Sequence, residues 1–251
     1  MIFSRPIPAR VGGLKLWLDA ASPQSLYTDS ARTTLVAANN DPVGAWSDIS
    51  GNGYHATQAT SSKRPLYKTS GLNGTPCLQF DGTDDSMSTP SIDLSSTQAC
   101  TVFIVANIAN NSAYFLEFSP STNSNAGAFL LYTFADYAIT FINGNVGTAE
   151  HRVYNTGTLS TAHAFRSEID FSKASSEPTT YRDGTTETGV RPTDGNNSGN
   201  LGNYSLYIGG RNNASNFLNG TISDILLYNR ALAAGEKSTI QAYLKAKRGT
   251  P

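Results

Sequence analysis

A strand pattern near the carboxyl terminus constrains the fold more than any other part of the sequence. Residues 222–224 are Ile, Ser and Asp and include polar positions, whereas residues 225–228 are Ile, Leu, Leu and Tyr, apolar at every position. A strand that is apolar on both faces has to be covered from both sides. One cover follows directly in the chain, because residues 236–247 carry apolar side chains at helical spacing with lysines opposite. The sequence therefore predicts a covered central strand followed by a single short helix.

Several other segments have strand patterns that are separated by short turns. Residues 101–106 are apolar on both faces and predict a second central strand. Its predicted neighbours are residues 114–118, 129–134 and 137–142. Residues 179–188 predict a hairpin around Asp183 and Gly184, because an Asp-Gly pair suits the tight turn between paired strands. Many short strands joined by turns are typical of a β-sandwich.

Three further segments carry a resemblance to a known family. Residues 14–20, residues 46–57 with their Trp, Asp and Ser-Gly-Asn-Gly turn, and residues 76–85 resemble the early strands and acidic loop of laminin-G-like domains. These domains belong to the concanavalin A-like lectin/glucanase superfamily and occur in phage virion and bacterial surface proteins. The resemblance implies an all-β fold, a concanavalin A-like jelly-roll β-sandwich of two antiparallel sheets with a short C-terminal helix. Residues 14–251 would form this domain, after an extended N-terminal arm of residues 1–13 that is either a disordered leader or a docking arm that packs on another subunit.

Composition argues against several other classes of protein. Only 15% of the 251 residues are charged and the net charge is −1, so no basic surface predicts binding to nucleic acid or to an anionic membrane. No apolar run has the length that is needed to span a bilayer. The first ten residues lack a long apolar core and contain two prolines, so we expect no signal peptide.

One strand pattern invites a catalytic interpretation. Alternation along residues 163–172 places Arg166, Glu168 and Asp170 on one face. Laminarinase-type glucanases of the superfamily resemble this segment locally, with a nucleophile, a helper aspartate and an acid/base on one strand. Retaining hydrolysis requires a second catalytic carboxylate at a short, fixed distance from the first, but the corresponding position here is Ser172. We therefore expect no enzyme activity and a solvated face on which Arg166 balances the two acids.

The cysteines and histidines predict no disulfide and no zinc site. Cys77 and Cys100 both lie in apolar strand patterns, which is typical of buried free thiols in a protein assembled in the cytoplasm. His55, His151 and His163 lie far apart in the sequence, and no two of them have the spacing of a zinc-ligand pair.

Calcium is the one cofactor that the resemblance implies. Laminin-G-like relatives often hold Ca²⁺ at the rim of the sandwich with aspartate, asparagine and backbone oxygens, the ligands that this ion prefers. Asp81, Asp84 and Asp85 form the densest acidic cluster of this chain, and Asp48 and Asn52 form a weaker one. The alternative is that all of these are turn residues whose side chains accept hydrogen bonds from nearby backbone N–H groups.

The fold analogy also implies a glycan ligand. A sugar site needs an aromatic platform and several hydrogen-bonding groups on one rim of the sandwich. The candidate glycan-binding residues are Tyr204, Arg211, Asn212, Asn213 and Asn197. Other polar loops would supply similar groups, and a fold does not by itself determine a function.

Two functional hypotheses follow from the sequence. The first is a non-enzymatic phage virion protein, a capsid decoration, fibre or tail component assembled in the host cytoplasm. Its N-terminal arm would bind other virion proteins, its body would bind cell-surface glycans, and it would form a homo-oligomer. The second is an extracellular, free-standing carbohydrate-binding module or adhesin. The absence of an export signal favours the first hypothesis, and a glycoside hydrolase is the least favoured interpretation.

Overall fold

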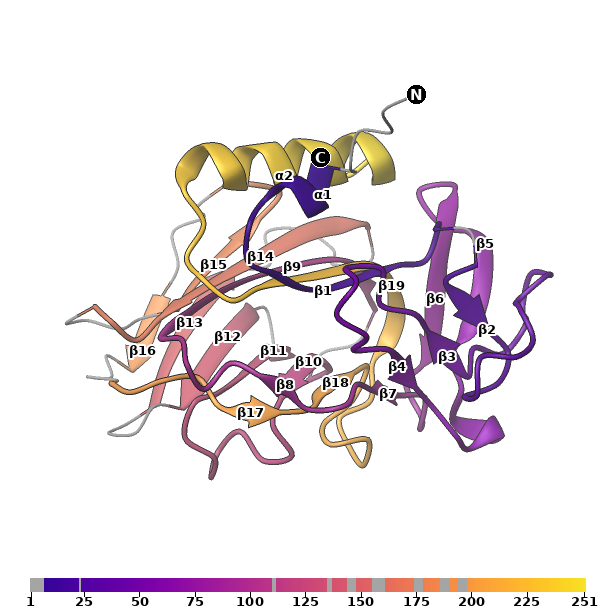
Figure 1. The fold of residues 1–251 in the computed structure, drawn as a ribbon, viewed down its shortest axis with the longest axis horizontal. Coiled ribbons are helices and arrows are strands. Elements are labelled where there is room, and N and C mark those ends of the chain that lie inside the picture. The colour runs from indigo at the N-terminus through magenta and orange to yellow at the C-terminus, as the bar shows by residue number, and fades with distance from the viewer. Residues whose placement is uncertain are drawn as a thin grey trace.

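The structure is a computed structural model in which two antiparallel sheets pack face to face and one helix covers the outer side of one sheet (Figure 1). It describes residues 7–22, 24–109, 112–134, 137–143, 148–154, 161–173, 178–185, 190–193 and 198–251. The predicted fold class, an all-β sandwich with a short C-terminal helix, is confirmed.

The first sheet, sheet A, has the strand order β15-β14-β9-β19-β6-β5, with β1 beside β19. Its strands are β1 (Leu14–Asp19), β5 (Leu66–Leu72), β6 (Thr75–Asp81), β9 (Ala99–Ile108), β14 (His163–Asp170), β15 (Thr179–Arg182) and β19 (Asn219–Tyr228). The two strands that were predicted to be central, β9 and β19, pair with each other in the middle of this sheet. Ile225 and Leu227 of β19 pack in the sandwich interior, whereas Leu226 and Tyr228 pack on the helix side.

The second sheet, sheet B, has the order β16-β13-β12-β11-β10-β18-β7-β4-β3-β2. Its strands are β2 (Leu26–Tyr27), β3 (Ala45–Trp46), β4 (Ala56–Thr57), β7 (Met87–Ser88), β10 (Tyr114–Phe118), β11 (Ala128–Phe134), β12 (Tyr137–Asn143), β13 (Thr148–Tyr154), β16 (Val190–Thr193) and β18 (Leu206–Ile208). Two short strands, β8 (Ile92–Asp93) and β17 (Asn203–Tyr204), pair separately, and η1 (Ser61–Lys63) is a single 3₁₀ turn.

Buried apolar side chains form two layers. The larger layer fills the space between sheets A and B and contains Trp46, Phe80 and Cys100. The smaller one lies between sheet A and helix α2 (Ala234–Arg248) and contains Cys77 and Ile240. Both cysteines are buried free thiols, as expected.

A β-bulge in β10 decides which side chains face outward from sheet B. The register to β11 shifts between Tyr114 and Leu116, so Phe115 and Leu116 both point into the interior. Regular alternation would have sent one of these two side chains to the outside. The extra residue leaves Tyr114 and Glu117 on the outer face of sheet B.

Helix α2 is held to sheet A by what we call the buried ion network: Asp19, Asp224, Lys247 and Arg248. Lys247 Nζ lies 2.5 Å from Asp19 and 3.0 Å from Asp224, and Arg248 Nη2 lies 2.8 Å from Asp19. Arg248 Nε also donates to Asp224, and both of these side chains are fully buried. Two acids and two bases compensate one another, which is the condition for burying charge in a core.

The start of the chain differs from the extended arm that was expected. Ile7–Arg10 form one turn of helix, α1, whose Pro8 is buried. Proline is compatible with the first turn of a helix because the amide hydrogen that it lacks would have no partner there. Tyr228 Oη donates to the Pro8 carbonyl oxygen over 3.1 Å, and Arg230 Nε donates to that of Gly12 over 2.9 Å. The root of the arm is therefore attached to the sandwich, and residues 1–6 lie outside the described residues.

The predicted hairpin turn is present. Asp183 and Gly184 both have positive φ angles, 54° and 81°, and Thr185 N–H donates to the Arg182 carbonyl oxygen over 3.0 Å. Two consecutive positive φ angles are the signature of the type I′ turn that an Asp-Gly pair favours. The second predicted strand, residues 185–188, falls mostly outside the part of the chain that the structure describes.

Candidate functional site

Aromatic side chains line the outer face of sheet B, which we define by Tyr114 and Glu117 of β10, Leu130 and Tyr132 of β11 and Tyr207 of β18. In the ladders Tyr114 lies opposite Tyr132, and Glu117 lies between Leu130 and Tyr207. The rings of Tyr114 and Tyr132 are tilted at 48° with their centroids 5.2 Å apart, and both side chains are half-buried. This pair forms a solvent-facing aromatic surface.

The segment after β18, residues 211–216, borders this surface, and we call it the Arg211 loop. Arg211 N–H donates to the Ser215 carbonyl oxygen over 2.8 Å, and Tyr114 N–H donates to that of Asn216 over 3.0 Å. The three asparagines of the loop have left-handed backbones, with φ angles of 48° at Asn212, 53° at Asn213 and 51° at Asn216. Asparagine tolerates this conformation better than other residues with a side chain. The guanidinium carbon of Arg211 lies 5.7 Å from the centre of the Tyr114 ring.

Glu117 joins the strand to the loop. Its side chain has 0% exposure, although it lies on the outer face, because loop segments cover it. Oε1 accepts hydrogen bonds from Thr122 N–H, 3.2 Å, and Thr122 Oγ1, 2.8 Å, and Oε2 accepts one from Asn212 N–H, 2.9 Å. Arg211 Nε lies 4.0 Å from Oε1. Burial, and secondarily the charge of Glu117, raises the pKa of Tyr207 beside it.

The candidate glycan residues are only partly brought together. Arg211, Asn212 and Asn213 lie in one loop, but Tyr204 belongs to the separate β8–β17 pair. Tyr204 Oη donates to the Ala126 carbonyl oxygen over 2.9 Å, and its ring packs edge-on against Phe118 at 5.7 Å between centroids. Asn197 lies outside the described residues.

Sequence reasoning missed Tyr114 and Tyr132 as the aromatic neighbours of Arg211. Their strands were predicted, but the direction in which each side chain points was not. The register shift beside Tyr114 changes that direction, and no residue pattern in the segment predicts the shift.

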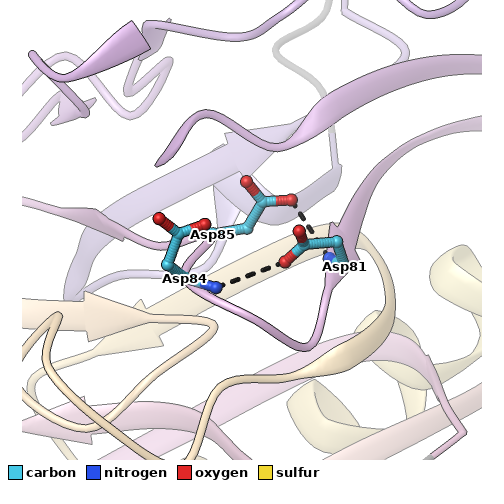
Figure 2. Close-up of side chains that lie close together, drawn as sticks. All are labelled: Asp81, Asp84 and Asp85. Carbon is cyan, nitrogen blue, oxygen red and sulfur yellow. Dashed lines mark hydrogen bonds between the residues drawn. The ribbon is translucent and has the colours of Figure 1, made fainter. Parts of the chain in front are cut away.

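The predicted acidic cluster, Asp81, Asp84 and Asp85, forms in the turn after β6. Each residue offers one carboxylate oxygen, and these oxygens lie within 4.8 Å of one another. Figure 2 shows the three side chains converging. Asp81 Oδ1 accepts hydrogen bonds from the backbone N–H groups of Thr83, 2.8 Å, and Asp84, 3.3 Å. Asp85 Oδ2 accepts one from Asp81 N–H over 3.0 Å. The turn-forming role is therefore present for two of the three residues.

The electrostatics of this cluster are unusual for a simple turn. Burial, reinforced by the charges of Asp81 and Asp84, raises the pKa of Asp85 to about 7. Burial would also raise the pKa of Asp81, but hydrogen bonds from the turn lower it overall. None of the ion pairs found in the described ranges involves any of the three aspartates. Three converging oxygen ligands without a compensating cation suit the coordination chemistry of Ca²⁺.

The acidic cluster and the Arg211 loop lie on the same rim of the sandwich. Asp81 is the ladder partner of Asn219, which follows the loop by three residues. A Cβ atom on Gly82 would lie 2.8 Å from the Cβ atom of Asn219, so the acidic turn packs directly on the start of β19. A cation held by the acidic cluster would stabilise the turn that packs against the start of β19, three residues after this loop.

The weaker candidate for a calcium site, Asp48 and Asn52, is used for turn formation. Asp48 Oδ1 accepts hydrogen bonds from the N–H groups of Trp17, 3.0 Å, and Ser50, 2.9 Å. Its Oδ2 accepts from Ser50 Oγ, 2.9 Å, and Tyr54 N–H, 3.0 Å. Asn52 Nδ2 donates to the Lys15 carbonyl oxygen over 2.9 Å. These contacts bind the turn to β1, so the turn interpretation accounts for both side chains.

Of the two carboxylates of β14, Glu168 lies beneath helix α2, whereas Asp170 contacts residues just after the strand. Glu168 Oε1 accepts from Arg166 Nε over 2.8 Å, and Lys237 of the helix lies 3.0 Å from Glu168 Oε2. Asp170 accepts from Ser172 Oγ over 2.5 Å. Arg166 pairs with Glu168 as expected, whereas Asp170 pairs with Lys173 instead. Arg166 is only 8% exposed, so this face is largely covered instead of solvated. The expectation overlooked that α2 crosses this strand.

No helix in the described ranges is long and apolar enough to cross a membrane. A laminin-G family model, described as the concanavalin A-like lectin/glucanases superfamily, matches residues 81–236. No curated protein matches the chain.

Solved structures show the same fold at low sequence identity. A Trypanosoma rangeli sialidase superposes with a TM-score of 0.55 and 16% identity over 96% of this chain and 34% of its own. The binding domain of botulinum neurotoxin serotype G superposes with a TM-score of 0.63 and 10% identity over 95% of this chain and 54% of its own. The chain thus spans about a third of the sialidase and about half of the toxin domain.

Proposed function

The chain belongs to the concanavalin A-like lectin/glucanases superfamily, and on that premise we propose that it is a non-enzymatic domain that binds glycans. The proposed binding surface is the outer face of sheet B together with the Arg211 loop. The observation that carries this proposal is the Tyr114–Tyr132 ring pair beside Arg211. Aromatic faces pack against the apolar faces of sugar rings, while arginine and asparagine side chains hydrogen-bond the hydroxyl groups around them.

The similar structures support a binding role without defining its ligand. One of them is a sialidase solved with sialic acid, and another is a toxin domain that binds a receptor. These properties belong to those proteins. At identities of 16% and 11% they indicate a shared fold, and the argument for a glycan in this chain depends on its own outer-face residues.

The absence of enzyme activity is part of the proposal. Glu168 is engaged by Arg166 and Lys237, and Asp170 lies near Lys173, whose Nζ is 3.5 Å away. A glutamate covered by a helix and held by two cations, beside an aspartate paired with a lysine, is poorly placed to act with it as the nucleophile and acid of a glycosidase. Incubation with β-glucans that releases no reducing sugar is the expected result. Release that is lost in Glu168→Gln would overturn this part of the proposal.

Calcium is proposed as the ion of the rim. Asp81, Asp84 and Asp85 would hold it through one carboxylate oxygen each. When bound, Ca²⁺ would neutralise the three carboxylates and order the turn next to the Arg211 loop. We therefore expect glycan affinity to be higher in calcium than in a chelator.

A glycan microarray with matched variants tests the binding proposal. We expect Tyr132→Ala and Arg211→Ala to lower the affinity for the best glycan roughly tenfold or more, the usual effect of removing a central contact. Arg10→Ala is the matched control, because Arg10 is an exposed arginine of α1, on the α2 side of the molecule. An array on which the folded wild type binds nothing would overturn the proposal.

We also propose that the domain functions in a phage virion, as a homo-oligomer whose N-terminal arm, residues 1–13, contacts other virion proteins. The layer order supports this arrangement, because α1 packs on α2 at the side of sheet A that faces away from sheet B. A contact made there leaves the glycan surface exposed. Deleting residues 1–6 should abolish incorporation into particles and leave glycan binding intact. Unchanged incorporation would favour the alternative, a free-standing extracellular binding module.

A further inference from the structure

Glu117 makes contacts that neither sugar binding nor the sandwich core requires. It is a fully buried carboxylate on a face that also carries the half-buried aromatic side chains of Tyr114, Tyr132 and Tyr207. Both of its oxygens accept hydrogen bonds, and the donors come from two different loops. Thr122 lies in the β10–β11 connection, and Asn212 lies in the Arg211 loop, 95 residues from Glu117. One side chain therefore ties two loops to one strand.

The contacts require a carboxylate specifically. Oε1 faces the Thr122 N–H and hydroxyl groups, and Oε2 faces the Asn212 N–H group. A carboxylate accepts at both oxygens, whereas the amide of glutamine accepts at one atom and donates at the other. A glutamine could accept hydrogen bonds from only one of the two loops. Its NH₂ group would face the N–H donor of the other loop, and two donors cannot form a hydrogen bond.

The Arg211 loop needs such an anchor. Its three asparagines adopt the left-handed backbone conformation. This conformation is sparsely populated and persists only where the surrounding structure enforces it. Two of them, Asn212 and Asn213, are consecutive, and the hydrogen bond to Glu117 is made by the first. The same carboxylate lies 4.0 Å from Arg211 Nε, so it also restrains the side chain that faces the Tyr114 ring.

We propose that Glu117 is a positioning residue that holds the Arg211 loop in its binding conformation. This inference rests on the proposed function, because the loop is part of the proposed glycan surface. Glu117 does not touch the ligand. It acts by keeping Arg211 and Asn213 in place before the ligand arrives, which lowers the ordering cost of binding.

The test compares Glu117→Gln with Glu168→Gln in two measurements. Glu168→Gln is the matched control, since it makes the same chemical change in a partly buried, ion-paired glutamate on the outer face of the other sheet. In Glu117→Gln we expect amide hydrogen exchange across residues 209–218 to accelerate roughly tenfold or more, the loss expected for a hydrogen bond to a charged group. Affinity for the best glycan should fall by a similar factor. The control should leave both unchanged.

The outcomes distinguish the positioning role of Glu117 from the proposed glycan binding. Unchanged exchange across residues 209–218 in a folded Glu117→Gln protein overturns the positioning role. Faster exchange with unchanged affinity overturns its relevance to binding. A wild type that binds no glycan overturns the proposed function, and the exchange result still decides whether Glu117 holds the loop.

A second variant covers the case in which Glu117→Gln does not fold. Thr122→Val removes the hydroxyl donor to Oε1 and leaves the Arg211 loop untouched. We expect a smaller loss of affinity, roughly threefold, with no change in the residues that face the ligand. Equal affinity in this variant and the wild type would overturn the proposal.

Discussion

The buried ion network and the acidic cluster are two groups of aspartates in one molecule that meet their electrostatic demands differently. In the network, Asp19 and Asp224 face Lys247 and Arg248, so the charges cancel in the core. In the acidic cluster, the aspartates face one another, and the pKa of Asp85 rises to about 7 as burial and its neighbours disfavour the charged form. The first group is complete within the chain. No basic side chain in the described part of the chain pairs with the second, and we infer from this difference that the acidic cluster, and not the ion network, is the candidate for binding a cation.

The largest expected effect on stability comes from disrupting the buried ion network. Arg248→Met should destabilise the protein by about 3–5 kcal/mol, because it leaves two buried carboxylates with one cation between them. Urea unfolding measures this change. Lys245→Met, an exposed position in the same helix turn, should stay within about 0.5 kcal/mol of the wild type. A loss below about 1 kcal/mol for Arg248→Met would mean that the network is not a stabilising anchor.

The next effect concerns Asp85 and pH. Its pKa of about 7 in the folded protein lies above the value of about 3.9 in an unfolded chain. The folded protein therefore favours the protonated form of Asp85. The resulting contribution to stability is fully present below about pH 4 and is lost as the pH rises through 7. In a chelator, the stability of the wild type relative to Asp85→Asn should fall by up to about 4 kcal/mol between about pH 4 and pH 8. Asp85→Asn should then be the more stable protein at about pH 8, and the reverse order would contradict the assignment.

Calcium should offset the loss of stability that the wild type shows relative to Asp85→Asn at about pH 8. At a concentration of about 100 times its dissociation constant, Ca²⁺ would stabilise the wild type by about 2.7 kcal/mol, because it binds the folded state alone. The gain should shrink below about pH 7, where protons compete for Asp85. Melting curves with calcium and with chelator provide the measurement. Asp85→Asn should show little or no shift, and an equal shift in both proteins would place the ion elsewhere.

The smallest effect is expected for a complete pair that is exposed. Glu236 accepts from Arg230 Nη2 over 2.6 Å and from Ala233 N–H over 2.8 Å, and these bonds lower its pKa to about 2. Glu236→Ala should cost about 1 kcal/mol, mostly through loss of the helix cap. Because the pKa of Glu236 is lower in the folded protein than in the unfolded chain, its carboxylate stabilises the folded state at pH values above the unfolded pKa. This stabilisation is lost as the pH falls toward about 2. Urea unfolding of the variant at neutral and acidic pH would show the difference disappearing in acid.

Local patterns predicted the elements of this fold, because periodicity reports which faces of a segment are buried. Strand β19 and helix α2 were predicted in this way, and so was the turn at Asp183 and Gly184. The pairing of Arg248 with Asp19 could not be predicted, because the two residues are 229 positions apart and no local pattern links them. The site was predicted in part for the same reason. The Arg211 loop and the acidic turn are local, whereas the position of Tyr114 depends on a bulge and that of Tyr204 on a strand partner.

The placement of the two described ends of the chain has a practical consequence. Ile7 and Ala246 line the same groove beside α2, and Figure 1 shows both ends on that side of the molecule. A fluorescent protein, a biotin tag or a bead coupled next to either described end would thus be attached on the side opposite sheet B. The domain could be displayed in tandem copies or inserted into a loop of a carrier protein with its aromatic surface still directed toward solution.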